Sequence, residues 1–388
     1  MSNFSATCDR QALLKAVNHI YRCPRQDGRE KTRSVLVTVR EDTIELSVLF
    51  HPNKGRMALR IAATETIPGT ATIDTAVLRQ FIRHATDTKV AITKIGDEKT
   101  PKVRITCGTT RLSINGMVST IDERPVVEYG TPTPLPETLA KSWPMLRCCT
   151  AQDDSRDVLY ALHISVSDGR ATMETCDGFR LAQLIAHTAV PNMEAVIPLP
   201  MMRLLPAGVP IAIAEDQKAR HIRCSWDGGE IDIEVASPST FPDLNRVLEA
   251  SRGTGMISGD RKSLLEQIES VISIALPDGQ QSIGIILHAG QVQIAAKSMV
   301  GVATALYEGE SRGEGDVSMN PTFLCDILRS VNAKKVSLRL SFVIKSEGSN
   351  VIDFSDDTGN EKYPTYAVMG MNIQSTLFSA EDREALGL

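Results

Sequence analysis

The residues of this chain that could do chemistry are scattered along the sequence and do not form a known catalytic motif. Its seven histidines stand singly, and a lone histidine is more often a surface or hydrogen-bonded residue than a metal ligand. The segment from Gly255 to Ser263 resembles a phosphate-binding loop, but Asp260-Arg261 interrupts the glycine-to-lysine step that the Walker motif requires. His-Glu-x-x-His and Gly-x-Ser-x-Gly motifs are also absent from the sequence. We therefore predict that the protein is not an enzyme, unless residues far apart in the sequence form its site.

The cysteines give no sign of a metal site or of a disulfide framework. The eight cysteines are spread out, only Cys148 and Cys149 are close together, and there is no Cys-x-x-Cys motif. Acidic pairs such as Asp153-Asp154 lie in turn-like segments, where aspartate is favoured for backbone reasons. The sequence therefore predicts free thiols in a reducing cytoplasm, with no cofactor and no metal.

Length and composition indicate a globular protein of two or three domains. The chain has 388 residues, of which 42% are hydrophobic and only 4% aromatic, so aliphatic side chains must build its core. The longest apolar runs are as short as a strand, for example Ile283 to Leu287, which predicts no membrane span. The residues from Met1 to Phe4 show no secretory signal, and we expect a cytoplasmic protein.

A pattern typical of an amphipathic helix occurs near the N-terminus and again in the last third of the chain. After Asp9, and again after Asp260, an arginine is followed by apolar side chains at helical spacing. A weaker copy in the middle third contains Trp143 and Pro144. Because proline removes a backbone donor and clashes with the preceding turn, we expect this middle helix to be kinked or to start late.

A second helix type, followed each time by a strand and a hairpin, also occurs three times, around Leu78, Met202 and Leu324. The whole repeat has a period of about 120 residues, which is typical of one domain. The predicted domains and the tail that follows them are 1–130, 131–250, 251–373 and 374–388. The alternative is an ordinary multi-strand protein whose similar segments coincide by chance.

The middle third contains a segment, Cys176 to Ala182, at the junction of two predicted strands. Upstream of it, Asp168-Gly169 lies between alternating apolar runs, which predicts a hairpin with a type I′ turn. The segment therefore follows the second strand of a hairpin and leads into another strand, Leu181 to Ala186. Taken alone, Asp177-Gly178 is simply one more turn.

The predicted helices carry a net positive charge, although the net charge of the chain is −5. One explanation is that lysine and arginine are good helix formers whose charged ends stay solvated. The functional explanation is a basic inner surface that faces phosphates, inside an acidic exterior that repels nucleic acid. The asymmetry alone supports the functional explanation only weakly.

Three motifs, together with the threefold repeat, resemble the bacterial sliding clamp family, the β subunit of DNA polymerase III. The motifs are Asp177-Gly178-Phe179-Arg180-Leu181-Ala182, Phe241-Pro242-Asp243 and Tyr366-Ala367-Val368-Met369-Gly370-Met371. The first is similar to the family's Thr-Asp-Gly-His-Arg-Leu-Ala, and the last to its closing Tyr-Val-Val-Met-Pro-Met-Arg-Leu. The resemblance covers residues 1–373.

The resemblance implies an α+β fold with three repeated DNA-clamp domains per chain. Two chains would join head to tail into a ring, with helices inside and β-sheets outside. The implied function is that of a DNA sliding clamp, a processivity factor in DNA replication that encircles duplex DNA and tethers the replicative polymerase without base readout. The implied partners are double-stranded DNA, a DNA polymerase, a clamp loader and a second copy of the chain. The competing interpretations are a monomeric β-rich binding protein and an enzyme with a dispersed site.

The family's partner-peptide pocket lies between the second and third domains. Carried over by motif, its residues here would be Cys176, Gly178, Phe179, Arg180, Leu181, Pro242, Arg246, Val247, Asn320, Phe323, Met369, Gly370 and Met371. The chain departs from the family pattern at four positions: Cys176, Phe179, Gly370 and Asn372 stand where Thr, His, Pro and Arg are usual. These departures keep the pocket apolar but change its shape.

Several of these residues also have a purely structural interpretation. Leu181, Val247 and Phe323 could be ordinary core residues, and Met369 and Met371 could belong to a buried edge strand. Methionine on a surface groove would instead offer an adaptable binding surface. We favour the groove because the motifs occur together.

Two further sets of residues are predicted to act in the ring. The residues expected to supply phosphate-facing charge are Arg10, Lys15, Arg22, Arg25, Arg79, Arg83, Lys141, Arg147, Arg203, Arg329, Lys334 and Lys335. The residues expected to close the dimer interface are Leu112, Ile114, Ile272, Ile274 and Leu276. The alternative role of the second set is packing inside a domain.

The tail contains a segment, Gln374 to Phe378, that resembles the short peptide by which partners of this family dock. Ser375 stands where an apolar residue is usual. Either Leu377 and Phe378 pack on the adjacent sheet, or the tail occupies the groove and competes with partners at high effective concentration.

Overall fold

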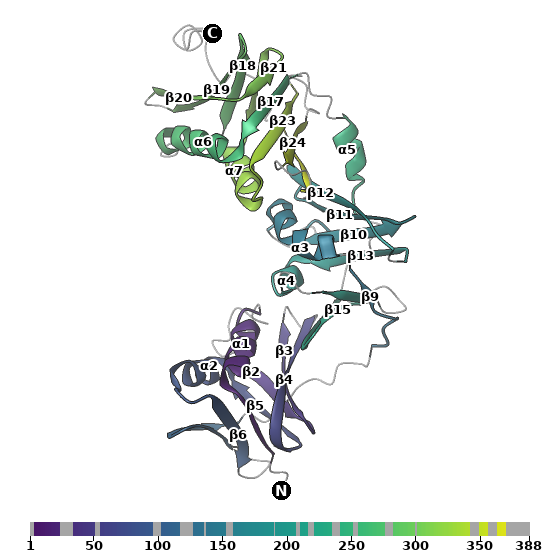
Figure 1. The fold of residues 1–388 in the computed structure, drawn as a ribbon, viewed down its shortest axis with the longest axis vertical. Coiled ribbons are helices and arrows are strands. Elements are labelled where there is room, and N and C mark those ends of the chain that lie inside the picture. Colours follow the sequence, from purple (N-terminus) through teal and green to yellow (C-terminus); the bar gives the residue numbers. More distant parts are fainter. Residues whose placement is uncertain are drawn as a thin grey trace. The chain divides into compact units, whose positions relative to one another are not determined.

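The computed structural model places most of the chain in antiparallel sheets with helices packed against them (Figure 1). The residues that it describes are 4–23, 34–50, 55–95, 102–116, 127–135, 137–152, 158–189, 191–206, 210–215, 221–234, 241–250, 255–275, 282–298, 301–341, 349–355 and 363–369. The tail predicted at 374–388 lies outside them. The chain forms two compact units, which are Met1–Leu135 with Pro200–Ala236 and Pro136–Leu199 with Ser237–Leu388. Residues 131–250, predicted as the middle domain, contribute to both units, and the division into three domains stays a prediction.

The first unit combines two helices with one large antiparallel sheet. Its helices are α1 (Arg10–Tyr21) and α2 (Thr75–His84), and the short α4 (Leu199–Met202) lies at the unit boundary. Its strands are β1 (Ser5–Asp9), β2 (Ser34–Val39), β3 (Thr43–Phe50), β4 (Gly55–Ile67), β5 (Gly69–Asp74), β6 (Lys89–Ile95), β7 (Lys102–Cys107), β8 (Thr110–Asn115), β9 (Thr133–Pro134), β14 (Ala212–Glu215), β15 (His221–Trp226) and β16 (Gly229–Glu234). Among the described residues they form one sheet, in which β4 pairs with β1, β3 and β16, and β8 is an edge strand.

The second unit contains two sheets and most of the remaining helices. Its helices are α3 (Glu137–Leu146), η1 (Arg147–Cys149), α5 (Leu244–Ala250), α6 (Arg261–Ala275) and α7 (Pro321–Ser330). Its strands are β10 (Ala161–Ser167), β11 (Arg170–Cys176), β12 (Arg180–His187), β13 (Met193–Pro198), β17 (Gly255–Asp260), β18 (Ile283–His288), β19 (Gln291–Ser298), β20 (Gly301–Tyr307), β21 (Glu310–Arg312), β22 (Gly315–Met319), β23 (Lys335–Leu340), β24 (Ser349–Ser355) and β25 (Thr365–Met369). Within the described part of the chain, β12 pairs with β25 in the larger sheet, while β18, β19, β20 and β22 form the smaller one.

The hairpin predicted before the Cys176 segment is confirmed. Strands β10 and β11 pair in antiparallel register and are joined at Asp168-Gly169. Both turn residues have positive φ, 52° for Asp168 and 73° for Gly169, as a type I′ turn requires. Strand β11 ends at Cys176 and β12 begins at Arg180, so the intervening residues form the predicted second turn.

The repeated helix pattern also corresponds to repeated local structure. Helix α1 begins after Asp9, whose carboxylate accepts a hydrogen bond from Ala12 N at 2.8 Å. Helix α6 begins after Asp260, whose carboxylate accepts from Ser263 N at 2.6 Å. An aspartate at this position satisfies an amide of the first turn that has no partner within the helix. The same residue type therefore starts both helices for the same reason.

The arginine that follows each of these caps holds the next helix. Arg10 Nη1 donates to Ile82 O at 3.2 Å, near the end of α2. Arg261 Nη1 donates to Leu328 O at 2.7 Å in α7, and its Nε donates to Ala333 O at 2.6 Å. Because the last carbonyls of a helix have no partners within it, a guanidinium suits this position. The two arginines thus join two helix pairs in the same way.

The helix of the middle third, α3, was predicted from Pro144 to be kinked or to start late, and it does not start late. Helix α3 begins at Glu137, seven residues before Pro144. Pro144 lies close to its C-terminal end, where fewer backbone hydrogen bonds depend on the missing N–H. The flanking residues Trp143 and Leu146 are buried, and this apolar face keeps the helix against the sheet.

Candidate functional site

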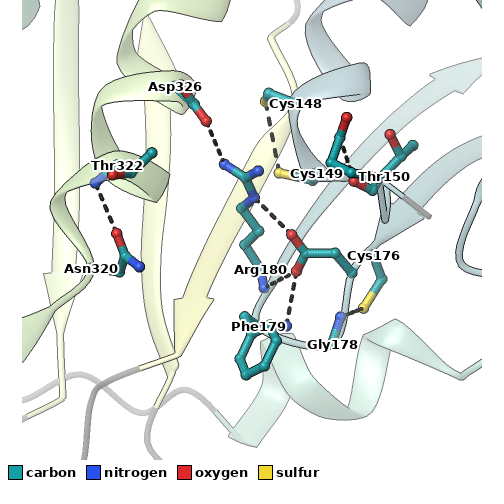
Figure 2. Close-up of polar contacts among 12 residues, drawn as sticks. Cys148, Cys149, Thr150, Cys176, Gly178, Phe179, Arg180, Asn320, Thr322 and Asp326 are labelled. Atoms are coloured by element: carbon teal, nitrogen blue, oxygen red, sulfur yellow. Dashed lines mark hydrogen bonds and ion pairs between the residues drawn. The ribbon is translucent and has the colours of Figure 1, made fainter. Parts of the chain in front are cut away.

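The turn between β11 and β12 exposes one aromatic side chain and buries the next residue. Asp177 accepts hydrogen bonds from Phe179 N and Arg180 N, both at 2.9 Å, and Gly178 has a φ of 91° (Figure 2). This aspartate turn, together with a left-handed glycine, is a favourable way to reverse the chain tightly. As a result, the side chain of Phe179 is 62% exposed.

Arg180 joins this turn to α7. Its Nε donates to Asp177 Oδ2 at 2.9 Å and its Nη1 to Asp326 Oδ2 at 3.0 Å (Figure 2). The residue is only 8% exposed, and its guanidinium lies 4.4 Å from the centre of the Phe323 ring. Burial alone would lower the pKa of Arg180, but the Cys149 thiol and the two carboxylates raise it, so the side chain stays charged. A buried charge with this many partners fixes the position of the turn.

Phe179, Phe323 and Met369 form an apolar surface beside Arg180. The two phenylalanine rings stack with their centres 6.1 Å apart and an interplanar angle of 30°. Met369 N donates to Phe179 O at 2.8 Å, and its side chain is 42% exposed. Aromatic and methionine side chains that remain accessible together are typical of a peptide-binding surface.

A buried cluster of Leu181, Leu244, Val351 and Ala367 adjoins this surface along the chain, since Leu181 lies on β12 just after Phe179 and Ala367 lies on β25 just before Met369. The side chains that pack against it, partly buried, are Cys176, Phe241, Val247 and Leu248. Leu181 is therefore buried among apolar side chains. Val247 and Phe323 remain partly exposed, as a wall of a binding surface would be.

His163 anchors the segment that leads into α5. His163 Nδ1 lies 3.1 Å from Glu174 Oε2, its Nε2 lies 2.9 Å from Glu194 Oε1, and its ring stacks on Phe241 at 4.6 Å. Burial alone would lower the pKa of His163, but the hydrogen bonds to both carboxylates raise it. Phe241 belongs to the Phe-Pro-Asp motif, so this contact holds the motif against the sheet.

A second polar contact holds α5 itself. Gln183 Nε2 donates to Glu174 Oε1 at 2.7 Å and to Asn245 Oδ1 at 3.0 Å. Gln183 and Glu174 are both buried. Helix α5 also bears Val247, so a buried polar network positions this part of the predicted site.

The other predicted pocket residues lie in different environments. Asn320 is the N-cap of α7 and accepts a hydrogen bond from Thr322 N at 2.9 Å. Pro242 and Arg246 are exposed, and Arg246 forms a surface ion pair with Asp243 at 3.3 Å. Gly370 and Met371 lie outside the described residues. Sequence reasoning missed Asp326, whose spacing from Arg180 gives no signal.

The predicted phosphate-facing residues differ in exposure and in their contacts. Those that are exposed are Lys15, Arg22, Arg83, Arg147, Arg203, Arg329, Lys334 and Lys335, whereas Arg10 and Arg79 are partly buried. Arg10 donates to the Ile82 carbonyl, Arg79 to Asn18 at 2.7 Å and Arg329 to Glu269 at 2.6 Å. Arg25 and the side chain of Lys141 lie outside the described part of the chain.

The predicted interface residues lie on an edge strand and on a helix. Leu112 and Ile114 are partly exposed on β8, and Ile272 is partly exposed on α6. Leu276 and the side chain of Ile274 lie outside the described residues. Leu306, which the sequence analysis does not single out, is an apolar residue 61% exposed on the edge strand β20.

The described residues contain no group of three or more histidine, cysteine, aspartate or glutamate side chains that could hold a metal ion. Among the helices that the structure describes, none is long and apolar enough to cross a membrane.

Comparisons with known proteins give a consistent result. No protein-family model matches the chain. It is similar to the Beta sliding clamp of Chlamydia muridarum (strain MoPn / Nigg), with 24% identity over 203 residues, which is 49% of this chain and 53% of the relative. The match thus spans about half the length of that curated relative.

The similarity to solved structures covers nearly the whole chain. For a sliding clamp, DNA polymerase III subunit beta, from Pseudomonas aeruginosa bound to griselimycin, the TM-score is 0.80 at 20% identity, over 96% of this chain and 100% of that one. For the DNA polymerase III beta chain of Streptococcus pneumoniae the TM-score is 0.82 at 17% identity, over 96% and 100%. For the beta subunit of Thermotoga maritima it is 0.80 at 18% identity, over 95% and 100%. The chain therefore has the α+β fold of the bacterial sliding clamps, which confirms the predicted fold class and the resemblance.

Proposed function

We propose that this protein, which has the sliding-clamp fold, is a DNA sliding clamp that encircles duplex DNA and tethers a DNA polymerase for processive synthesis. The observation that carries the proposal is the similarity of the fold over 95% or more of the chain to three clamp structures. A clamp needs no catalytic group, in agreement with the scattered chemistry of the sequence. The proposed partners are double-stranded DNA, a clamp loader, a DNA polymerase and a second copy of the chain.

The proposed ring closes through contacts between two chains. One side is the edge strand β8 with Leu112 and Ile114, and the other is the end of α6 with Ile272, Ile274 and Leu276. A strand edge is a place where another chain can associate, and partly exposed apolar residues on β8 and α6 favour this contact because it removes them from water. A head-to-tail contact repeated twice closes such edges into a ring.

The proposed partner site is the apolar surface of Phe179, Phe323 and Met369, bordered by α5. Partners would dock a short peptide whose apolar side chains cover these residues, while the buried Arg180 keeps the turn in place. Phe179, where histidine is usual, presents an apolar phenyl face in place of a polar imidazole. We expect this face to favour peptides with aromatic or bulky aliphatic side chains over polar ones.

The proposed DNA contacts are made by the exposed basic residues of the helices and the segments beside them. Backbone contacts of this kind are numerous and exchangeable, so binding should weaken with salt and show no preference for a sequence. A strong preference for one duplex sequence would contradict the proposal.

The proposal is tested by retention on circular DNA. The protein is loaded onto nicked circular DNA by the clamp loader of its source organism and should stay bound until the circle is cut. The variant Leu112→Asp with Ile272→Asp should be a folded monomer by analytical ultracentrifugation and should not be retained. As a control, Ile67→Asp changes an apolar residue that is 53% exposed on β4 and should leave the dimer intact. Equal retention on circular and linear DNA, or a single-chain mass for the unmodified protein at micromolar concentration, would refute the proposal.

The partner site is tested with a Gln-Leu-Ser-Leu-Phe pentapeptide. Met369→Ala should weaken its binding about tenfold, because covering a methionine side chain contributes roughly 1.5 kcal/mol. Met256, which is 39% exposed on β17, provides the matched control, and Met256→Ala should leave the affinity unchanged. Equal affinities of the two variants would place the peptide elsewhere. The tail segment Gln374 to Phe378 stays a candidate competitor for this site.

A further inference from the structure

Two adjacent cysteines lie close to the partner site but have no part in the proposed function. Cys148 and Cys149 end the short helix η1, and their Sγ atoms are 3.8 Å apart (Figure 2). Cys148 is partly exposed, whereas Cys149 is fully buried. The pair therefore combines one thiol in a partly exposed residue with a second, buried thiol held against it.

The surroundings of the pair favour a reactive thiol at one position only. The hydrogen bond from Cys149 lowers the pKa of Cys148, helped by the Ser330 hydroxyl and the Arg180 guanidinium. Burial raises the pKa of Cys149 well above its ordinary value. A thiolate is the nucleophile in thiol chemistry, and nearby cations and hydrogen-bond donors favour it. Cys148 is accordingly the attacking group and Cys149 the resolving group.

We propose that Cys148 and Cys149 form an oxidation site at which a hydroperoxide produces a vicinal disulfide. The Cys148 thiolate attacks one oxygen of the hydroperoxide, the O–O bond breaks, and Cys148 becomes a sulfenic acid while an alcohol, or water from hydrogen peroxide, leaves. Cys149 then attacks the Cys148 sulfur and loses its proton, the S–O bond breaks, and water leaves. The two thiols are oxidised by two electrons, and the hydroperoxide is reduced.

Bond geometry makes this disulfide easy to reduce again. Adjacent Cα atoms lie about 3.8 Å apart across a trans peptide, whereas disulfides usually join Cα atoms roughly 4.4–6.8 Å apart. A bridge between neighbours is therefore strained, and strained disulfides are the labile ones. The modification should be reversible with a dithiol reductant.

Closure of the bridge must alter η1. The sulfur atoms have to approach from 3.8 Å to about 2.05 Å, which draws Cys148 away from the Met145 carbonyl that it now contacts at 3.3 Å. Thr175 on β11 donates to the neighbouring Leu146 carbonyl at 2.8 Å, so β11 is tied to the same segment. Helix η1 also packs against α7, which bears Asp326, and against β12, which begins at Arg180. Oxidation should consequently loosen the contact of Arg180 with Asp326.

The site is tested by mass spectrometry. The protein is treated with hydrogen peroxide, remaining thiols are alkylated, and the tryptic peptide of residues 148–156 should lack two hydrogens and carry no alkyl group. Formation of this disulfide should be faster at higher pH and should not occur in Cys148→Ser. Dithiothreitol should reduce the disulfide again. Cys149→Ala should instead accumulate a sulfenic acid that dimedone labels. Cys176→Ser, which removes the other partly exposed cysteine, should still form the bridge.

The coupling to Arg180 is measured separately. Trp143 is 5% exposed in α3, next to η1, and in a Trp226→Phe background its fluorescence should shift on oxidation of the pair but not in the Cys148→Ser protein. The last readout rests on the proposed function. If that function holds, oxidation should also weaken binding of the Gln-Leu-Ser-Leu-Phe pentapeptide about tenfold. A change of this size is expected when one charge-assisted hydrogen bond is removed. Unchanged peptide binding with a shifted Trp143 signal would refute the link to the partner site alone. Two alkylated thiols in the peptide of residues 148–156, after treatment with a peroxide solution that oxidises dithiothreitol in a separate tube, would overturn the oxidation site itself.

Discussion

The helix pair α1–α2 and the helix pair α6–α7 share one scaffold but differ in charge. In both, an aspartate caps the first helix, and the next residue, Arg10 or Arg261, reaches the end of the second helix. The backbone repeats as well, since Arg10 N donates to Thr88 O at 2.8 Å and Arg261 N donates to Lys334 O at 2.9 Å. The difference between the pairs therefore lies in the side chains that the scaffold carries.

Helices α1 and α2 contain four arginine or lysine residues, Arg10, Lys15, Arg79 and Arg83, and no acidic residue. In α6 and α7, acidic residues balance the basic ones, and Arg329 pairs with Glu269. In the first pair, the residue at the place of Glu269 is the neutral Asn18, which accepts a hydrogen bond from Arg79 at 2.7 Å. Arg79 also lies 4.6 Å from the Tyr21 ring. The same backbone arrangement thus carries a strongly basic first pair and a neutral second one.

The two arginines at the scaffold differ in how fully they are satisfied. Arg261 makes two short hydrogen bonds to carbonyls, whereas Arg10 makes one, and Arg10 Nε is buried without a partner among the described residues. In the first pair, the carbonyl at the matching place, that of Asp87, accepts from the Cys107 thiol instead. The α6–α7 pair therefore depends more on Arg261 for its stability than the α1–α2 pair depends on Arg10. The guanidinium of Arg10 keeps more of its hydrogen-bonding capacity unused.

The largest expected effect separates the two arginines by stability. Arg261→Ala should lower the free energy of unfolding of its unit by about 3 kcal/mol, because it removes two hydrogen bonds from a charged group. Arg10→Ala should cost about 1.5 kcal/mol, since it removes only one such bond. Urea denaturation followed by circular dichroism measures both. Equal decreases would mean that the Nε of Arg10 finds a partner in solution, and the two arginines would then be equivalent.

A second prediction separates the pairs by their effect on DNA. Arg83 and Arg329 are both exposed near the end of their helices, but the described residues provide an ion-pair partner only for Arg329. Arg83→Ala should make DNA retention less dependent on salt. The slope of log affinity against log salt concentration should fall by about one for each phosphate contact that is lost. Arg329→Ala should change it much less, because Glu269 already offsets that charge. Retention on circular DNA across a series of sodium chloride concentrations distinguishes the two.

Glu269→Gln tests the difference in charge from the opposite direction. It should release Arg329 from its ion pair and make the salt dependence of the α6–α7 pair more like that of α1–α2. Surface ion pairs contribute little to stability, so the variant should fold as well as the unmodified protein. An unchanged salt dependence in Glu269→Gln would show that this helix pair does not face DNA.

The smallest expected effect is a pH dependence of stability that arises in the α1–α2 pair. Burial lowers the pKa of His19 on α1, although the contact with the Leu204 carbonyl opposes this; Arg22 and Lys15 add to the decrease. The unfolded chain therefore binds a proton more readily than the folded one, and stability should fall as the pH decreases from about 6.5 through the lower pKa of the folded state. Urea denaturation at pH 8 and at pH 5.5 should show this decrease, and His19→Gln should reduce it. No change in the pH dependence for that variant would contradict the assignment.

Much of the scaffold could be predicted from the sequence because its signals are local. Asp9 and Asp260 act three residues from the amides that they cap, and the Asp168-Gly169 turn lies between two adjacent strands. Neighbouring residues set helical period and turn chemistry, so the sequence was sufficient to predict the repeated helices, this hairpin and the turn before Arg180.

The partners of the charged side chains could not be predicted in this way. Arg10 is predicted to supply phosphate-facing charge, but no local signal shows that its guanidinium also contacts the Ile82 carbonyl, 72 residues away. Arg180 was expected in the partner site, but its pairing with Asp326, 146 residues away, has no trace in the sequence.

Helix starts, turns and core-facing positions follow from the sequence alone, because they depend on backbone sterics and on contacts within a few residues. The tertiary structure was needed to show which charges are neutralised, which thiols meet and which aromatic rings stay exposed. These properties depend on segments far apart in the chain, and helical or strand period shows the direction of a side chain but not what it will meet.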